Sequence, residues 1–182
     1  MWCAVRHPAG ERDRRGDAGD EAGAEAERAG FAQARLFLDT ARVHTAARAV
    51  GLARAALEDS VRYLQEREQF GHPIGDFQAL RFAVAEMAAQ VEQARAFYRQ
   101  VAHLLDLGVP CEKEAMVKLE ATEMSVRVTN QAMQLHGGNG YTTERQVERH
   151  WRDARLTTIF EGTSEIQKRI ISDRLLPRSP LT

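Results

Sequence analysis

The sequence predicts an all-α protein, an antiparallel up-down four-helix bundle with a disordered N-terminal tail. Apolar residues recur at steps of three and four along several long segments, and glycine and proline punctuate the short connections between them. No stretch alternates apolar and polar residues as a half-buried strand does. Helices joined by short loops pack as antiparallel neighbours. We therefore divide the chain into a tail, residues 1–30, and a helical domain, residues 31–182.

The tail is predicted from its composition. Between Gly10 and Gly30 there is no aromatic and no branched aliphatic residue, and further glycines interrupt the segment. Such a segment cannot bury enough apolar surface to offset the conformational entropy lost on ordering, so we expect disorder. The N-terminus also has no apolar run of signal-peptide length, so export by that route is not expected.

The first two predicted helices have clear apolar stripes. The first carries apolar residues at helical spacing up to Leu64 and ends at R-E-Q-F-G, residues 67–71. The second has the strongest pattern of the chain, because apolar residues alternate steps of three and four from Phe77 to Leu105 without a slip. Glycine and proline at 108 and 110 end it.

The third predicted helix begins around Glu112 and ends at H-G-G-N-G, residues 136–140. The fourth position of the bundle is divided between a short polar helix, Glu144 to Ala154, and a final helix from about Ser164 to Leu176. Ser164 followed three residues later by Gln167 is typical of a capping box.

Composition excludes several classes of protein. Charged residues make up 28% and hydrophobic residues 43%, which indicates a globular protein without a membrane span. With 25 Lys and Arg against 26 Asp and Glu, the chain has no basic field that would attract nucleic acid. Cys3 and Cys111 are too few for a disulfide framework, and His136 has no second ligand at metal-binding spacing. We expect a cytoplasmic protein without a metal.

Glu161 is the first candidate for chemistry. It stands between the apolar pair Ile159 and Phe160 and the small residue Gly162, just before a predicted helix. The apolar pair would desolvate its carboxyl group, and glycine would leave the backbone open to a ligand, which suits a proton-abstracting base. A loop carboxylate stabilised by the helix dipole explains the same residue without chemistry, and local features leave both interpretations open.

Two other junctions combine glycine with polar side chains, at residues 67–71 and 134–140. Backbone N–H groups at glycines can approach phosphates, and Arg67 could pair with a pyrophosphate. The alternatives are a solvated arginine and an ordinary helix C-cap followed by a turn.

Taken together, the motifs resemble a known family. R-E-Q-F-G at 67–71, F-Q at 77–78, L-H-G-G-N-G-Y at 135–141, W-R-D-A-R at 151–155 and F-E-G-T-S-E-I-Q at 160–167 occur in the order and on the helices of the C-terminal domain of the acyl-CoA dehydrogenases. The resemblance runs from about Phe31 to Pro177, and the joint match outweighs the separate alternatives.

The resemblance implies FAD-dependent oxidation of an acyl-CoA thioester to its trans-2-enoyl product. It implies that Glu161 takes the α proton and that its backbone N–H, with a flavin hydroxyl, holds the thioester oxygen. Gly162 would keep this backbone accessible to the substrate. L-D-T-A-R at 38–42 is similar to the family's substrate-side motif, which places Arg42, with Asp39, near the CoA moiety.

The resemblance also implies FAD contacts, partly to the FAD of a neighbouring subunit. That group comprises Arg67, Phe70, Gln78, Gln134, Gly137 and Gly138. Thr163 and Glu165 would bind the subunit's own FAD. By the same resemblance the protein forms a homo-oligomer, a dimer of dimers, and passes electrons to an electron-transfer flavoprotein.

The sequence departs from the family before the bundle, where full-length members have a helical domain and a β domain. A low-complexity segment stands there, as expected of a truncated gene, a misassigned start or a subunit that takes the missing domains from a partner. The alternative function is therefore a noncatalytic helical oligomerisation module or a partner subunit of a split acyl-CoA dehydrogenase.

Overall fold

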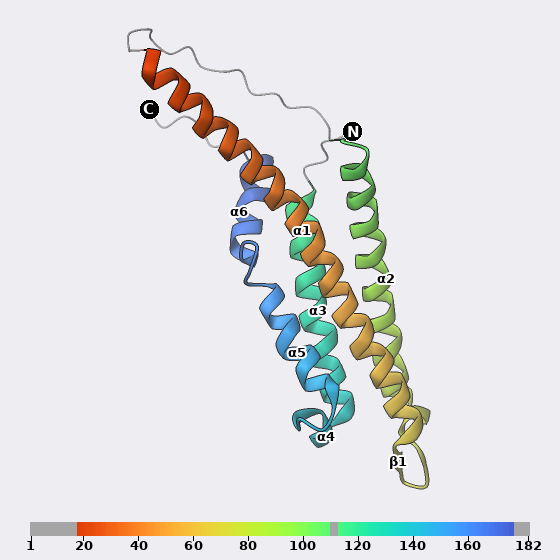
Figure 1. Cartoon of the computed structure of the whole chain (residues 1–182). Coiled ribbons are helices and arrows are strands. Elements are labelled where there is room, and N and C mark those ends of the chain that lie inside the picture. Colours follow the sequence, from red (N-terminus) through yellow and green to blue (C-terminus); the bar gives the residue numbers. More distant parts are fainter. Residues whose placement is uncertain (1–17, 110–112, 177–182) are drawn as a thin grey trace.

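The computed structural model describes residues 18–109 and 113–176, and these residues form an all-α structure, as predicted. Three long helices are followed by three shorter ones (Figure 1). They are α1 (Ala18–Glu66), α2 (Gln78–Asp106), α3 (Glu114–His136), α4 (Gly138–Tyr141), α5 (Gln146–Thr157) and α6 (Ser164–Leu175).

Successive long helices run in opposite directions along the bundle (Figure 1). α3 is central, because it contacts α1, α2, α5 and α6. α5 and α6 together occupy the fourth position, and the turn between them lies beside α3. The candidate base Glu161 lies in this turn.

A tight hairpin joins α1 to α2. Strands β1 (Glu68–Gln69) and β2 (His72–Pro73) pair in antiparallel fashion, and a single 3-10 turn, Ile74–Asp76, leads into α2. Phe70 and Gly71, the two residues between the strands, both have positive φ angles, 58° and 88°, as a type I′ hairpin turn requires. The sequence predicted only a loop here.

The core is built from the predicted apolar stripes. Four alanines of α1 are 0% exposed, namely Ala46, Ala49, Ala53 and Ala56. Small side chains let α1 approach its neighbours closely, and larger apolar residues of α2 and α3 fill the remaining space. These include Met87, Val91 and Val101 on α2, and Val117, Met124 and Val128 on α3.

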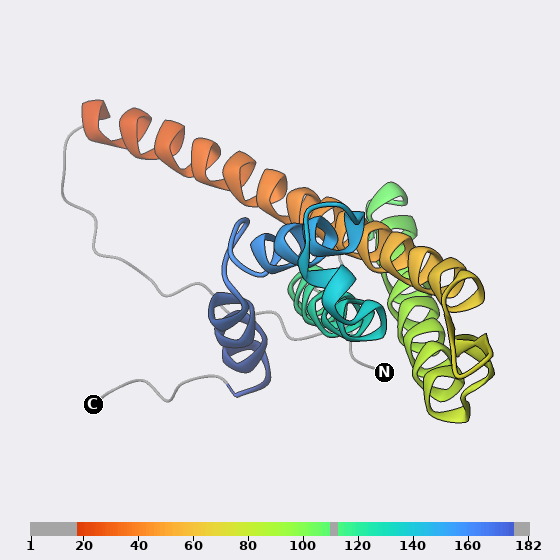
Figure 2. The same cartoon turned by 90° about the horizontal axis from the view of Figure 1, so that it is seen from below.

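The predicted tail is wrong in its second half, because α1 begins at Ala18 and residues 18–30 are helical. Residues 1–17 of the predicted tail lie outside the described residues. Alanine and glutamate, which favour helices, are frequent between 18 and 30. Extending a helix that is already formed is also far easier than nucleating one. Figure 2 shows this part of α1 projecting beyond the other helices.

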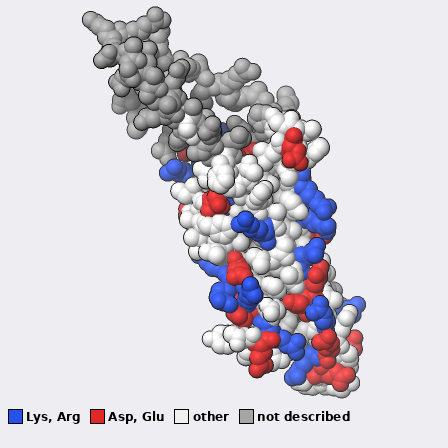
Figure 3. Space-filling model, viewed as in Figure 1, with Lys and Arg blue, Asp and Glu red and all other residues white. Residues whose placement is uncertain are grey.

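The surface carries both signs of charge. On the face seen in Figure 3, acidic and basic side chains are interspersed. None of the helices in the described ranges is long and apolar enough to cross a membrane.

Candidate functional site

The turn between α5 and α6 has an unusual backbone. Glu161 and Gly162 both lie in the left-handed region, with φ angles of 55° and 90°. Glycine adopts this conformation freely, whereas a residue with a side chain does so at a cost of about 1–2 kcal/mol. The turn thus stores strain at the residue that the sequence predicts to be the base, and such strain persists only where the surroundings impose it.

Two buried side chains, one from α3 and one from α6, donate hydrogen bonds to the carbonyl oxygens of this turn. Lys118 of α3 donates from Nζ to the Gly162 carbonyl oxygen at 2.7 Å. Gln167 of α6 donates from Nε2 to the same oxygen at 3.0 Å and to the Glu161 carbonyl oxygen at 3.2 Å. The Ser164 backbone N–H closes the turn by donating to the Thr158 carbonyl oxygen at 3.1 Å. The carbonyls of both left-handed residues are therefore fixed by side chains.

The predicted capping box is not present. The N-cap of α6 is Thr163, whose Oγ1 accepts from the Ile166 backbone N–H at 3.4 Å. Ser164 Oγ instead donates to Glu123 Oε1 of α3 at 2.5 Å, and Gln167 reaches back to the turn. The predicted pairing is wrong because both side chains have partners outside the first turn of α6.

Gly162 has a local structural role besides the substrate access that the sequence suggested. A Cβ atom at this position would lie 2.6 Å from Gln167 Nε2, and the φ angle already disfavours any side chain. Ile159, which we expected to cover the Glu161 carboxylate, is 50% exposed. The described residues therefore do not enclose the turn on its Ile159 side.

Charged groups from several elements meet beneath the turn. Lys118 is 0% exposed, and this burial lowers its pKa to about 8, although Glu123, Glu161 and Glu165 act in the opposite direction. Arg42 of α1 lowers the pKa further. The charged form of Lys118 is therefore unfavourable here. Lys118 loses its proton near pH 8, within the pH range in which the protein can be studied.

Asp39 and Arg42, predicted to lie on the substrate side, form an ion pair at 2.6 Å on α1. The Arg42 side chain is 11% exposed, and its buried Nε has no partner among the described residues. Arg42 also acts on Lys118, so α1 contributes to the charge environment of the turn. Arg42 therefore belongs to the charged surroundings of the Glu161 turn, and Asp39 is its ion-pair partner.

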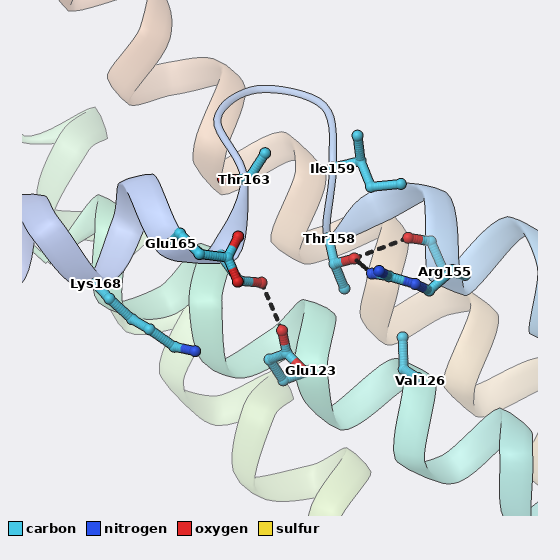
Figure 4. A pocket seen from close by; sticks show the side chains of 9 residues that line it. Glu123, Val126, Arg155, Thr158, Ile159, Thr163, Glu165 and Lys168 are labelled. Carbon is cyan, nitrogen blue, oxygen red and sulfur yellow. Dashed lines mark hydrogen bonds between the residues drawn. The ribbon is translucent and has the colours of Figure 1, made fainter.

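A cleft of about 480 Å³ lies next to the turn, between α3, α5 and α6. Figure 4 shows Glu165 and Lys168 of α6 facing the cleft, with Glu123 of α3 and Arg155 of α5 on its other sides. Thr163, one of the predicted cofactor residues, also lines it. Glu161 is not among the residues that line the cleft.

Two hydrogen bonds favour the ionised form of Glu165. A hydrogen bond from its own backbone N–H and one from the Thr163 side chain lower its pKa. Thr163 and Glu165, both predicted to bind the same FAD, therefore lie at one site and interact with each other.

The other predicted cofactor residues lie at the opposite end of α3. They form two exposed groups, Arg67, Phe70 and Gln78 around the hairpin and Gln134, Gly137 and Gly138 at the α3–α4 junction. Figure 1 shows β1 and α4 at the same end of the bundle, away from α6. The structure thus separates the predicted cofactor residues into two sites.

Internal contacts anchor the glycine-rich junction. His136 stacks on Tyr63 of α1 with ring centroids 4.4 Å apart, and Asn139 Nδ2 donates to the Tyr63 hydroxyl at 3.0 Å. Burial lowers the pKa of His136, which favours the neutral form of the ring that stacks on the tyrosine. A Cβ on Gly137 or Gly138 would meet no atom within 4 Å, so both backbones are open to an approaching group.

The sequence reasoning missed Lys118 and the role of Gln167. A signal for the lysine was present, since Lys118 stands three residues after Ala115 and three before Ala121, on the buried face of α3. A charged residue on such a face needs a polar partner, but the pattern does not name the partner.

Comparison with known proteins identifies the family. The sequence profile described as "Acyl-CoA dehydrogenase, C-terminal domain" matches residues 28–176. The probable acyl-CoA dehydrogenase YngJ of Bacillus subtilis is 50% identical over 148 residues, 81% of this chain and 39% of that protein. The caffeyl-CoA reductase-Etf complex subunit CarC of Acetobacterium woodii is 42% identical over 150 residues, 82% of this chain and 40% of the relative.

A solved structure agrees with these matches. The butyryl-CoA dehydrogenase of Megasphaera elsdenii superposes with a TM-score of 0.75 at 42% identity, covering 76% of this chain and 37% of that one. The chain thus spans about two fifths of the length of the relatives it matches. It belongs to the acyl-CoA dehydrogenase family and corresponds to that family's C-terminal helical domain.

Proposed function

We propose that this chain is the base-bearing domain of an FAD-dependent enzyme that oxidises an acyl-CoA thioester to the trans-2-enoyl product, with Glu161 as the base. One observation carries the proposal. Glu161 occupies a left-handed position that two buried side chains, Lys118 and Gln167, hold from different helices. Strain imposed in this way is characteristic of functional sites.

The chemistry needs two things from the protein. An α proton beside a thioester is weakly acidic, so a positioned carboxylate must accept it and donors must stabilise the developing enolate oxygen. Glu161 supplies the carboxylate. The backbone N–H groups of Glu161 and Gly162 have no acceptor within the described part of the chain, so either can donate to a substrate oxygen. A bound FAD would supply the acceptor for the hydride that leaves the β carbon.

The residues present fit an FAD cofactor. At the hairpin end, the exposed Arg67 supplies a guanidinium for a pyrophosphate, and the open backbones of Gly137 and Gly138 allow close approach. At the other end, the side chains of Thr163 and Glu165 supply a hydroxyl and a carboxylate in the cleft.

The two sites imply a shared cofactor arrangement. From Glu123, which contacts α6, to Gln134 is eleven residues of α3, a rise of about 16 Å. We propose that each end serves a different FAD, one belonging to this copy and one to a neighbour. We therefore propose a homo-oligomer, a dimer of dimers, in which neighbouring copies share their cofactors.

The electron acceptor is proposed to be an electron-transfer flavoprotein. A relative with 42% identity is named as a subunit of an Etf complex, which supports this choice. Because the chain spans about two fifths of its relatives, we propose that the remaining domains come from a longer protein or a partner subunit.

The test is Glu161→Gln in the protein combined with the domains that make it active. Glutamine preserves size but cannot accept the α proton, so anaerobic flavin bleaching by acyl-CoA should slow by roughly 100-fold to 10,000-fold. Acyl-CoA binding, measured separately, should change little. Glu120→Gln is the matched control, because Glu120 is exposed and forms a surface ion pair with Arg127. Bleaching at the wild-type rate in Glu161→Gln would place the base elsewhere.

A noncatalytic oligomerisation module or partner subunit is the second candidate. Large apolar side chains are exposed on α5 and α6, including Leu156 of α5 and Leu175 of α6. Such residues favour protein contacts without requiring a cofactor. The visible absorbance of the purified protein distinguishes the two. A flavin spectrum at one FAD per chain supports the enzyme, and protein that stays colourless with added FAD supports the module.

A further inference from the structure

Lys118 is the most unusual buried group in the described structure. It is 0% exposed, it lies on the inward face of α3, and its Nζ contacts a backbone carbonyl 44 residues away in sequence. Lysine is almost never fully buried unless it is paired. No ion pair of Lys118 within 4 Å occurs among the described residues, so its bonding partner is the Gly162 carbonyl.

Lys118 helps to fix the orientation of the peptide groups in the Glu161–Gly162 turn. The Gly162 oxygen receives two donors, Lys118 from α3 and Gln167 from α6, and Gln167 also holds the Glu161 oxygen. The carbonyl oxygens of Glu161 and Gly162 therefore both point toward the side chains of Lys118 and Gln167. A trans peptide is planar, so fixing the oxygen of residue 161 also fixes the N–H of residue 162.

We propose that Lys118 is the positioning residue of the Glu161–Gly162 turn, which holds the left-handed backbone so that the Glu161 carboxylate and the adjacent N–H groups face the substrate. This inference rests on the proposed function and extends it to a residue outside the turn. Lys118 touches neither substrate nor cofactor in this role. It acts through the Gly162 carbonyl.

The charges around Lys118 agree with such a role. Glu123 of the same helix, Glu161 in the turn and Glu165 of α6 favour its protonated form, whereas burial and Arg42 of α1 oppose it. A neutral apolar side chain would fill the same space without desolvating a charge. Burial alone therefore does not account for a lysine, but the hydrogen bond to the turn does.

The first arm of the test measures the turn directly. The reporter is the Ser164 backbone N–H, which closes the turn on the Thr158 carbonyl. In Lys118→Met, we expect hydrogen exchange at Ser164 to accelerate by roughly tenfold or more, because one of the donors that hold the turn is lost. Amides of α2 should exchange as in the wild type.

Lys113→Met is the matched control, because Lys113 is the N-cap residue of α3 and its side chain makes no capping hydrogen bond. If Lys118→Met does not fold, Lys118→Gln removes the charge and shortens the side chain by one atom while keeping a polar group in the site. Equal exchange at Ser164 in the Lys118 variant and in Lys113→Met would overturn the proposal, whatever the activity.

The second arm separates positioning from a purely structural role. In protein combined with its missing domains, the limiting rate of flavin bleaching should fall by about tenfold or more in Lys118→Met, with the acyl-CoA concentration for half-saturation unchanged. Faster exchange with an unchanged limiting rate would refute the positioning role. If Glu161→Gln proves as active as wild type, the proposed function fails, and exchange at Ser164 alone decides whether Lys118 holds the turn.

Discussion

Lys118 should make the stability of the protein depend on pH above neutrality. Burial lowers its pKa from 10.5 to about 8, a difference of about 2.5 units. Each unit corresponds to about 1.4 kcal/mol, so the folded state carries a cost of up to about 3 kcal/mol when the lysine is charged. Below pH 8 both states are protonated and the whole cost is present.

The sign follows from proton binding. Between pH 8 and 10.5 the unfolded chain keeps the Lys118 proton and the folded chain has lost it. The unfolded state therefore binds more protons, and the free energy of unfolding rises with pH through this window. Above pH 10.5 both states are neutral and the contribution stops changing.

Urea denaturation at pH 7, 8, 9 and 10 measures this effect, with Lys118→Met beside the wild type and Lys113→Met as the control. Other groups titrate in all three proteins, so the informative quantity is the difference between variants. At pH 7, Lys118→Met removes the charge cost but also a hydrogen bond to a charged group worth about 1.5–3 kcal/mol, so its stability should be close to wild type. Relative to wild type, it should become less stable by up to about 3 kcal/mol as the pH rises to 10. If the free energies of unfolding of wild type and Lys118→Met change with pH in parallel, the pKa of Lys118 is not lowered in the folded state and the prediction is wrong.

Three further outcomes are expected. Gly162→Ala should destabilise the protein by about 1–3 kcal/mol in urea denaturation, because its Cβ would lie 2.6 Å from Gln167 Nε2 at a φ angle of 90°, and wild-type stability would exclude the observed backbone. Glu161→Gly should be more stable than Glu161→Ala by about 1 kcal/mol, since both remove the carboxylate but only glycine relaxes the left-handed backbone; the reverse order in thermal melts would remove the argument from strain. Light scattering should find an oligomer at micromolar concentration, and a strict monomer would contradict the shared cofactor geometry and most of the role proposed for Arg67.

The long helices could be predicted because burial in a bundle repeats along the chain. The three-and-four pattern from Phe77 to Leu105 places Met87, Val91 and Val101 in the core, and the structure buries all three. Composition does not predict the helix at residues 18–30, because the entropy cost of ordering a segment is smaller when the segment extends an existing helix. In the structure these residues are part of α1, which continues to Glu66, and extending a helix costs less than nucleating one.

The site was predictable only as a set of residues along the chain. The glycine pattern and the family motifs identify the turn around Glu161, but the contact of Lys118 with Gly162 joins residues 44 positions apart. Periodicity gives the face on which a side chain lies and does not give the atom it meets. The assignment of Gln167 to a capping box failed for the same reason, because its partner lies six residues back, outside the helix.

The turn itself bears on whether the chain is catalytic or only a scaffold. A scaffold needs complementary apolar surfaces and stable helices, and neither requires a glutamate at a φ angle of 55° or a fully buried lysine beside it. Glycine at 161 would relieve the strain, and an apolar residue at 118 would avoid the desolvated charge. Both energetic costs fall on the Glu161–Gly162 turn. They accompany two features that proton abstraction needs, a carboxylate on a fixed backbone and N–H groups that have no acceptor in residues 18–109 and 113–176. A turn that bears a catalytic base accounts for both the left-handed backbone of Glu161 and the buried charge of Lys118. A purely helical scaffold accounts for neither, so the two features favour the enzymatic proposal.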